Sequence, residues 1–534
     1  MTGLGTSKRR AADDSGDAEP RRAFRLWPPE ISWSGPALAA RAGPAWAGLT
    51  PAALWRNHRL FTVTALVSVL PRLVAALGFA PALLITDAFS YMAQAEHLTP
   101  LGQIRPDGYP LLLWVLKPFH SLLLVTSLQH LMGIALGTIV YGVLRSRGLP
   151  AWGATLAAAP TLFDSREIWM ESSILPDTLF TFVLMIAVAI LIVTPALTAW
   201  QAAAVGVLLS WASVIRGNGA PVFVVILVFL LVRRVGWRVI TACVTAFAVP
   251  LLGYMLLFFS EYGQFDITNS TGLFLWSRTM SFANCAVIKP PADLIPLCPQ
   301  NQPDHPTGPA PAWSVSALLA ERTPEQYLWD PDAWYSVAAH PGINAYTNHL
   351  ALQFAERAIA AQPLDYAKTV GEGVLLTFVA TDRSQSYLSL NFTPAPYIPA
   401  LDRFQAQDEE RYAHTGSNTR TVQPWAYLML LYQEPVWFPG VVYLVVMIGG
   451  LAGLIRRWRG PGVYAALAWG VALVNLVVPV AAHEMDYRYA ISAVPFACLA
   501  LGLVLVLVRR PPGPELAEAS EGPEVSEAED PAAA

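Results

Sequence analysis

The sequence predicts an all-α polytopic membrane protein, in which a helical core of about ten transmembrane helices carries an outer domain of mixed structure. Composition is the first reason, since 54% of the 534 residues are hydrophobic and 13% are charged, against about 25% charged residues in soluble domains. The second reason is a series of apolar runs of membrane-spanning length, and the third is the arginine clusters between them. The net charge of −4 predicts no nucleic-acid partner.

The chain divides by composition into five parts. Residues 1–57 are polar, arginine-rich and proline-rich, and we expect a disordered cytoplasmic tail. A transmembrane core at 58–259 is followed by an extracytoplasmic domain at 260–435, C-terminal transmembrane helices at 436–508 and an acidic, disordered cytoplasmic tail at 509–534. The apolar runs place the spans near 59–83, 124–144, 150–163, 173–195, 199–215, 220–232, 239–259, 436–455, 461–481 and 489–508.

The arginine clusters set the predicted orientation, because cytoplasmic loops carry an excess of basic residues. With both termini cytoplasmic, the inner loops hold Arg145, Arg147, Arg233, Arg234, Arg238, Arg456, Arg457, Arg459, Arg509 and Arg510. An extra span at 109–124 would move most of these clusters outside, so that segment is expected to lie along the interface. The prediction is a multi-pass plasma-membrane protein, and the excess of arginine over lysine indicates a bacterial source.

Polar residues from four distant loops are then predicted to meet at the outer membrane face. This is what a site built between helices requires. The candidates are Asp87, Tyr91 and Tyr109 in the first loop, Arg166, Glu171 and Asp177 in the second, Arg216 in the third, and Asp486 and Arg488 in the last.

Each candidate also has a structural interpretation. Asp87 could cap a helix, and the two tyrosines could anchor the interface. The arginines could extend their side chains to the interface, or bind phosphate through paired hydrogen bonds. The carboxylates of the second loop could bind a divalent cation such as Mg or Mn, but pairing with Arg166 is the favoured interpretation, so no metal site and no certain cofactor are assigned. His483 and Glu484 lack the spacing of a metal motif.

Two loops carry a resemblance to a known family. Asp87, Tyr91 and the turn Gly108-Tyr109-Pro110 resemble the first outer loop of the GT-C integral-membrane glycosyltransferases. The run from Asp164 through Glu171 to Asp177 resembles their second loop, and Arg216 and Asp486-Tyr487-Arg488 resemble arginines of later helices. The resemblance includes enzymes like the bacterial protein mannosyltransferases and aminoarabinose transferases, and it implies a GT-C-like core.

The resemblance implies transfer of a hexose or pentose from a polyprenyl-phosphate donor to a glycan, lipid or protein acceptor, with inversion. Asp87 would be the general base, and the other eight candidates would bind substrate. Protein O-mannosyltransferases carry a glutamate after the aspartate, whereas Ala88 follows here, which argues against a protein acceptor. A transporter or flippase of lipid-linked sugars, and a cell-wall glycan polymerase or ligase, remain as alternatives.

The cysteines separate into two pairs by environment. Cys285 and Cys298 lie in the predicted extracytoplasmic domain, where oxidising conditions favour a disulfide between them. Cys243 and Cys498 lie in apolar runs and are expected to pack as small hydrophobic residues.

Overall fold

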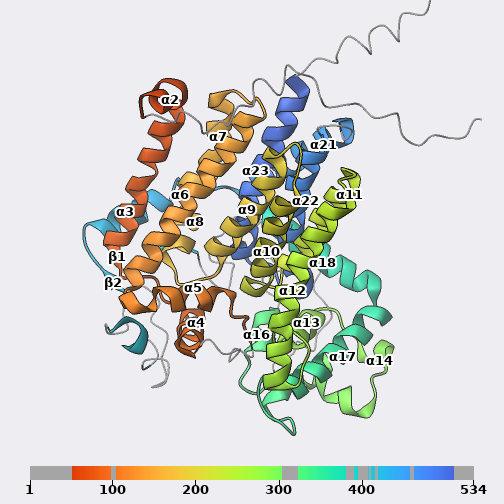
Figure 1. Cartoon of the computed structure of the whole chain (residues 1–534). Helices are drawn as coiled ribbons and strands as arrows, with labels where there is room; N and C mark the ends of the chain where they lie inside the picture. Colours follow the sequence, from red (N-terminus) through yellow and green to blue (C-terminus); the bar gives the residue numbers. More distant parts are fainter. Residues whose placement is uncertain are drawn as a thin grey trace, which may run out of the picture. The chain divides into compact units, whose positions relative to one another are not determined.

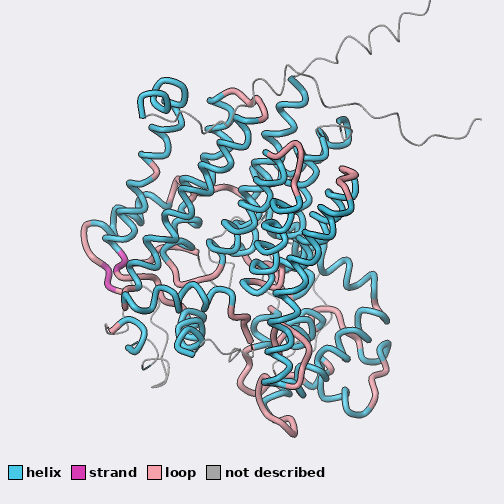
Figure 2. The backbone as a smooth tube through the Cα atoms, viewed as in Figure 1, coloured by secondary structure: helices cyan, strands magenta, loops and turns pink. Residues whose placement is uncertain are grey.

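The computed structural model describes residues 51–97, 104–303, 323–379, 390–394, 407, 410–414, 419–457 and 462–509. This part of the chain is helical apart from loops and one short two-stranded sheet (Figure 2). Most of both predicted tails lies outside the described residues. Helix α2 (Pro51–Val67) begins before the predicted tail boundary at residue 57.

Membrane-length helices of the described chain match five of the ten predicted spans. Five helices of the described chain are long and apolar enough to cross a membrane: His58–Gly78 (the end of α2 with α3, Val69–Gly78), α6 (Leu122–Ser146), α12 (Trp237–Tyr262), α22 (Gly462–Ala482) and α23 (Tyr487–Arg509). Four shorter apolar helices accompany them: α9 (Asp177–Val193), α10 (Ala199–Ile215), α11 (Gly219–Val232) and α21 (Gly440–Arg457). The chain is therefore an all-α membrane protein, and the count of about ten spans stays a prediction.

Two apolar runs form helices too short to cross alone. The run at 150–163 is α7 (Ala151–Phe163), and the segment 109–124 forms α5 (Gly108–Leu116) and the 3-10 turn η1 (Lys117–Phe119) before α6 begins. At 1.5 Å per residue, the nine residues of α5 extend about 14 Å, roughly half the hydrocarbon core of a bilayer.

The first apolar run leaves its helix earlier than expected. Instead of continuing to residue 83, α3 ends at Gly78, because Pro81 disfavours helical conformation at the residue before it. The strand β1 (Phe79–Ala80) follows and pairs antiparallel with β2 (Arg420–Thr421), Phe79 lying opposite Thr421. The short helix α4 (Thr86–His97) comes next.

The described residues of the region 260–435 contribute to two hydrophobic cores. Described residues between 273 and 358 build one of these cores around Trp276, Leu297 and Phe354, which we call the 273–358 core. In Figure 1 its helices lie at the lower end of the bundle, whereas the C-terminal ends of α11 and α23 lie at the upper end. They are α13 (Thr271–Thr279), α14 (Cys285–Ile288), η2 (Ala292–Leu297), η3 (Pro299–Asn301), α16 (Pro324–Leu328), η4 (Trp334–Ser336) and α17 (Ala345–Ala361).

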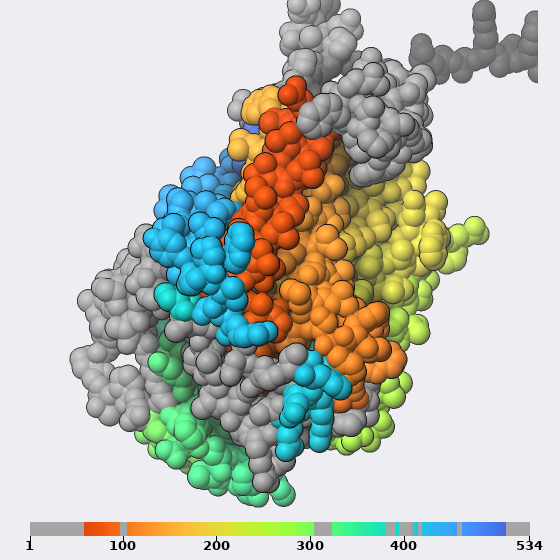
Figure 3. Space-filling model, turned by 90° about the vertical axis from the view of Figure 1, so that its left-hand side faces the viewer, coloured from red at the N-terminus to blue at the C-terminus, as the bar shows by residue number. Residues whose placement is uncertain are grey.

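The later part of that region packs on the transmembrane core instead. Phe378 at the end of α18 (Pro363–Val379) and Met429 of α20 (Trp425–Gln433) belong to the core of the bundle. Helix α20 packs against α3. In Figure 3, the blue part of the chain lies beside the red N-terminal helices. Glycine at position 78 permits this close packing, because a Cβ there would lie 2.8 Å from the Ala426 backbone nitrogen. Described residues on α18 and α20 thus share a hydrophobic core with the bundle, and the domain boundary at 435 stays a prediction.

Candidate active site

Asp87 stands in the first turn of α4, where the partial positive charge of a helix N-terminus favours a carboxylate. Arg105, from the segment before α5, forms an ion pair with it. The Arg105 guanidinium also lies 5.5 Å from the ring centre of Tyr91, one turn further along α4. Three groups of the first loop therefore meet at one point.

Arg488, in the first turn of α23, connects this point to the rest of the bundle. Its Nη1 lies 3.0 Å from Asp87 Oδ2, and its Nε lies 2.7 Å from Asp177 Oδ2 at the start of α9. Asp87 and Arg488 are 401 residues apart in the sequence. One guanidinium therefore joins two carboxylates from distant helices.

Arg216 completes the cluster at the end of α10. It forms an ion pair with Asp177, and its guanidinium lies 4.5 Å from the ring centre of Tyr489. The five groups form a continuous series of alternating sign, which we call the charge chain: Arg105, Asp87, Arg488, Asp177 and Arg216. Three cations and two carboxylates leave it with an excess of one positive charge.

The two carboxylates of the charge chain differ in access. The Asp87 side chain is 21% exposed, whereas that of Asp177 is 2% exposed. Burial alone would raise the pKa of Asp87, but Arg105 and Arg488 together hold that pKa below its ordinary value. Asp87 is thus an ionised carboxylate at neutral pH and the one that a ligand can reach.

Neighbouring backbone contacts fix the middle and one end of the charge chain. In the middle, Asp486 Oδ1 accepts the Arg488 backbone N–H at 2.9 Å, which caps the start of α23. Near the Arg216 end, Trp211 Nε1 donates to the Gly108 carbonyl at 3.0 Å. A Cβ at Gly108 would lie 2.5 Å from the Val214 backbone. The glycine therefore lets α5 reach the end of α10.

Tyr91 and Tyr109 pack against each other beside Arg105 of the charge chain. Their rings meet edge to face, with centres 5.3 Å apart. Tyr109 is fully buried, and its hydroxyl donates to Gln129 Oε1 at 2.8 Å. Because Tyr109 has no exposed surface, its role is structural: it packs against Tyr91, which in turn contacts Arg105.

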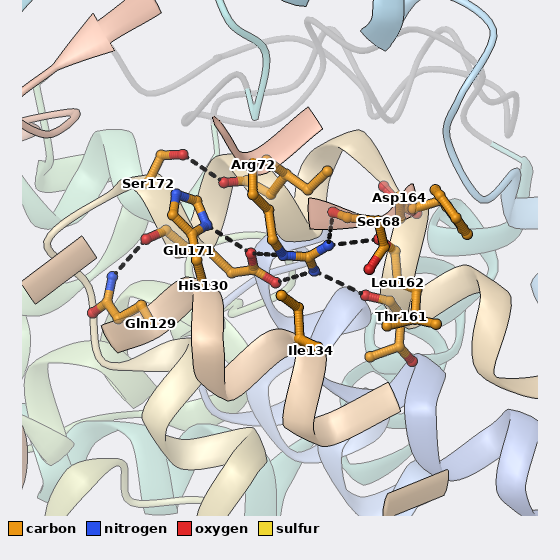
Figure 4. A network of polar contacts seen from close by, with 12 residues as sticks. Ser68, Arg72, Gln129, His130, Ile134, Thr161, Leu162, Asp164, Glu171 and Ser172 are labelled. Atoms are coloured by element: carbon orange, nitrogen blue, oxygen red, sulfur yellow. Dashed lines mark hydrogen bonds and ion pairs between the residues drawn. The ribbon is translucent and has the colours of Figure 1, made fainter. Parts of the chain in front are cut away.

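Glu171 lies in a separate, buried ion pair with Arg72 of α3 (Figure 4). Arg72 Nε and Nη2 donate to the two Glu171 oxygens at 2.8 and 2.7 Å, and His130 Nδ1 lies 2.8 Å from Oε2. Gln129 donates to the Glu171 and Ser173 carbonyls, linking this network to Tyr109. The structure therefore places Glu171 outside the charge chain, because its partners are Arg72 and His130.

Arg166 is likewise outside the charge chain. It lies at the start of α8 (Ser165–Ser172), with its guanidinium 4.7 Å from the ring centre of Trp437 and 4.5 Å from that of Tyr487. Asp164 caps this helix by accepting the Arg166 N–H, and it also accepts the Phe438 N–H, each at 2.8 Å. Tyr487 is the residue before Arg488, so Arg166 lies next to the start of the helix that carries Arg488.

Sequence reasoning missed Arg72 and Arg105. Arg72 lies within an apolar run, where an ionisable residue is costly and requires a partner. This cost could have indicated that Arg72 pairs with an acidic residue of another helix. Arg105 lies three residues before the Gly108-Tyr109-Pro110 turn, but nothing in the spacing showed that it would pair with Asp87.

The acidic residues of the second loop do not gather around one point that could hold a cation. Glu171 faces Arg72, and Asp177 faces Arg216 and Arg488. Burial, and then the nearby Glu171, raise the pKa of Glu167 well above its ordinary value. Within the described residues, the group with metal-ligand geometry is instead Glu325, His483 and Glu484, whose ligand atoms lie within 4.8 Å of one another.

A disulfide joins Cys285 and Cys298, with 6.1 Å between their Cα atoms. It ties α14 to the loop after η2 inside the 273–358 core. Cys243 and Cys498 are free and buried in helices α12 and α23.

Comparisons with known proteins give a distant likeness. No family model matches the chain, and no curated protein matches it. Among solved structures, apo ArnT from Cupriavidus metallidurans is similar with a TM-score of 0.32 and 14% identity, over 86% of this chain and 78% of that one. The same enzyme bound to undecaprenyl phosphate gives 0.30 and 12%, over 84% and 77%. At these scores the likeness carries no argument about the site.

Proposed function

We propose that the chain is a GT-C-type membrane glycosyltransferase that transfers a sugar from a polyprenyl-phosphate donor to an acceptor at the outer membrane face, with inversion. The observation that carries the proposal is the direct contact of Asp87 with Arg488. An accessible, ionised carboxylate lies beside arginines at the ends of helices long or apolar enough to be in a bilayer. These are the two groups that an inverting transfer requires, a base and a site for the departing phosphate.

The arginines suit a phosphate that arrives from the bilayer. Guanidinium groups bind phosphate oxygens through paired hydrogen bonds. The charge chain has an excess positive charge, and its Arg488 and Arg216 lie in the first turn of α23 and at the end of α10. A lipid-linked donor could therefore keep its tail among the helices while its phosphate meets the arginines. No nucleotide-binding motif is needed for such a donor.

Asp87 then acts as the base. Arg105 and Arg488 hold both of its oxygens and lower its pKa, which makes it a weak base. A donor phosphate would draw these guanidinium groups toward itself, and the pKa of Asp87 would rise. The carboxylate could then accept the proton of the acceptor hydroxyl as this oxygen bonds to the anomeric carbon and the lipid phosphate leaves. Positioned bases contribute roughly 10²–10⁴-fold in rate.

The acceptor class follows from the residue after Asp87. Ala88 is fully buried and supplies no second carboxylate, unlike the Asp-Glu pair of protein O-mannosyltransferases. We therefore favour a cell-envelope glycan or lipid as the acceptor.

The test is Asp87→Asn in purified full-length protein, supplied with polyprenyl-phosphate sugars and envelope acceptors. We expect kcat to fall at least about 100-fold while donor binding is kept, because both guanidinium groups are released for the phosphate. Asp365→Asn is the matched control, since Asp365 lies exposed on α18. Turnover of the Asp87 variant within tenfold of wild type would remove Asp87 as the base. Movement of the lipid-linked sugar across vesicles without transfer would favour a flippase.

A further inference from the structure

The residues Glu325, His483 and Glu484 lie outside the charge chain and form a second group of chemically capable side chains. Glu325 belongs to α16 of the 273–358 core, and the other two lie in the loop between α22 and α23. His483 and Glu484 are 6% and 7% exposed. Their ligand atoms, with that of Glu325, lie within 4.8 Å of one another.

Glu484 is a buried carboxyl group without a Lys or Arg in direct contact with it. Its Oε2 accepts the backbone N–H of Glu325 at 3.3 Å, and no Lys or Arg of the described chain lies within ion-pair distance of its carboxylate. Arg278 of α13 interacts electrostatically with Glu484 without forming an ion pair, and its Nη2 donates to the Thr369 carbonyl. A buried carboxylate without a close counter-charge is costly, so the group has a place for a positive charge.

The other two side chains are already oriented as ligands usually are. His483 Nε2 lies 2.6 Å from Glu325 Oε2, while its Nδ1 lies 3.2 Å from Ser277 Oγ. Trp329 Nε1 donates to the other Glu325 oxygen at 2.7 Å. Metal-bound histidines and carboxylates are typically fixed by such outer hydrogen bonds on the atom that does not bind the metal.

We propose that Glu325, His483 and Glu484 bind one divalent transition-metal ion of the Zn²⁺ type, which fastens α16 to the loop before α23. Two carboxylates and a neutral imidazole carry a charge of −2, which a divalent ion balances. One imidazole nitrogen with carboxylate oxygens favours Zn²⁺ over Mg²⁺ or Ca²⁺, which prefer oxygen alone. Ligand atoms around tetrahedral Zn²⁺ lie about 3.4 Å apart, so small side-chain rotations close the site.

The site has a consequence for the neighbouring charge chain. The loop that supplies His483 and Glu484 continues through Asp486, which caps the helix that carries Arg488. A bound ion would restrict this loop and so limit the motion of Arg488. The metal binds no substrate in this proposal, and its presence does not depend on the glycosyltransferase activity proposed above.

Metal binding to full-length protein in detergent tests the site without an activity assay. After removal of metals with a chelator, titration calorimetry with Zn²⁺ should give one tight site, and Mg²⁺ should give none at the same concentrations. His483→Gln and Glu484→Gln should each raise the dissociation constant for Zn²⁺ at least about tenfold. The matched controls His349→Ala and Glu356→Gln lie exposed on α17 and should leave it unchanged.

A spectroscopic measurement covers the case in which a variant fails to fold. X-ray absorption of the wild-type protein with one equivalent of Zn²⁺ should show a single imidazole nitrogen with oxygen ligands near 2.0–2.2 Å. Absence of a stoichiometric site in the wild type would overturn the proposal. So would binding that is unchanged in both site variants, selective binding of Mg²⁺, or a shell with two or more imidazoles.

Discussion

Replacing Glu171 by glutamine should destabilise the protein far more than a single surface substitution. The Glu171 side chain is 1% exposed and that of Arg72 is 2% exposed, and both Glu171 oxygens accept hydrogen bonds from Arg72. A glutamine keeps one acceptor oxygen, but its amide group must face a donor of Arg72 or His130. The guanidinium then remains buried without a counter-charge, and breaking a buried pair in this way costs about 3–5 kcal/mol.

The other hydrogen bonds of Arg72 favour a cost near the lower end of the range of about 3–5 kcal/mol. Its Nη1 also donates to the Ser68 and Leu162 carbonyls at 2.9 and 2.7 Å, so the guanidinium keeps some hydrogen bonds in the variant. We therefore expect a loss of about 3 kcal/mol in the free energy of unfolding. The double variant Arg72→Met with Glu171→Met should lose less than Glu171→Gln alone, because it leaves no unpaired ion.

Equilibrium unfolding in mixed micelles, followed by tryptophan fluorescence, measures these differences. Glu372→Gln is the control, because Glu372 pairs at 3.8 Å with Lys368, whose side chain is 69% exposed, and such pairs contribute about 0–1 kcal/mol. If Glu171→Gln loses no more stability than Glu372→Gln, the ion pair does not hold α3 against the bundle. If the double variant is the less stable of the two site variants, the unpaired-charge explanation is wrong.

Three further changes have expected outcomes. Arg488→Ala should raise the KM for a polyprenyl-phosphate donor more than Arg488→Lys, because lysine keeps the charge but loses the paired hydrogen bonds; equal and unchanged kinetics would limit Arg488 to a structural role. Burial raises the pKa of Asp107 to about 7, so the native state holds a proton that the unfolded state loses above about pH 4, and unfolding temperatures should fall as pH rises from about 4 to 7. Asp107→Asn should flatten that slope, and an unaltered slope would contradict the assignment. Reducing the Cys285–Cys298 disulfide, whose cysteines are 13 residues apart, should destabilise the protein by up to about 3 kcal/mol in the chain-entropy model, and a reduced protein of equal stability would contradict this.

The sequence predicts helices well here because membrane helices depend on length and hydropathy. The spans that became α6, α12, α22 and α23 follow directly from their apolar runs. The end of α3 at Gly78 and the pairing of β1 with β2 did not follow, because a strand of two residues has too short a pattern to detect. Helix α20 is also short, with nine residues, and its apolar sequence did not indicate whether it would pack on the outer domain or on the transmembrane core.

The site was predictable as a meeting of loops but not as a set of pairs. Positive charge in the inner loops placed Asp87, Asp177, Arg216 and Arg488 on the other side of the bundle, and the structure brings all four together. Glu171 had the same polarity and a nearby position, yet it faces Arg72. Which carboxylate meets which arginine depends on helix rotation and tilt, and packing against neighbouring helices sets both.

The charge chain also bears on how the protein is made. Asp87 emerges early in synthesis, and its partner Arg488 emerges 401 residues later in the last helix. Until α23 inserts, Asp177 has Arg216 as its cation and Asp87 has Arg105, and the two halves of the site remain unlinked. A chain that stops before residue 487 would insert most of its helices and still lack the group that joins them. Completion of the last helix is therefore the step that assembles the charge chain.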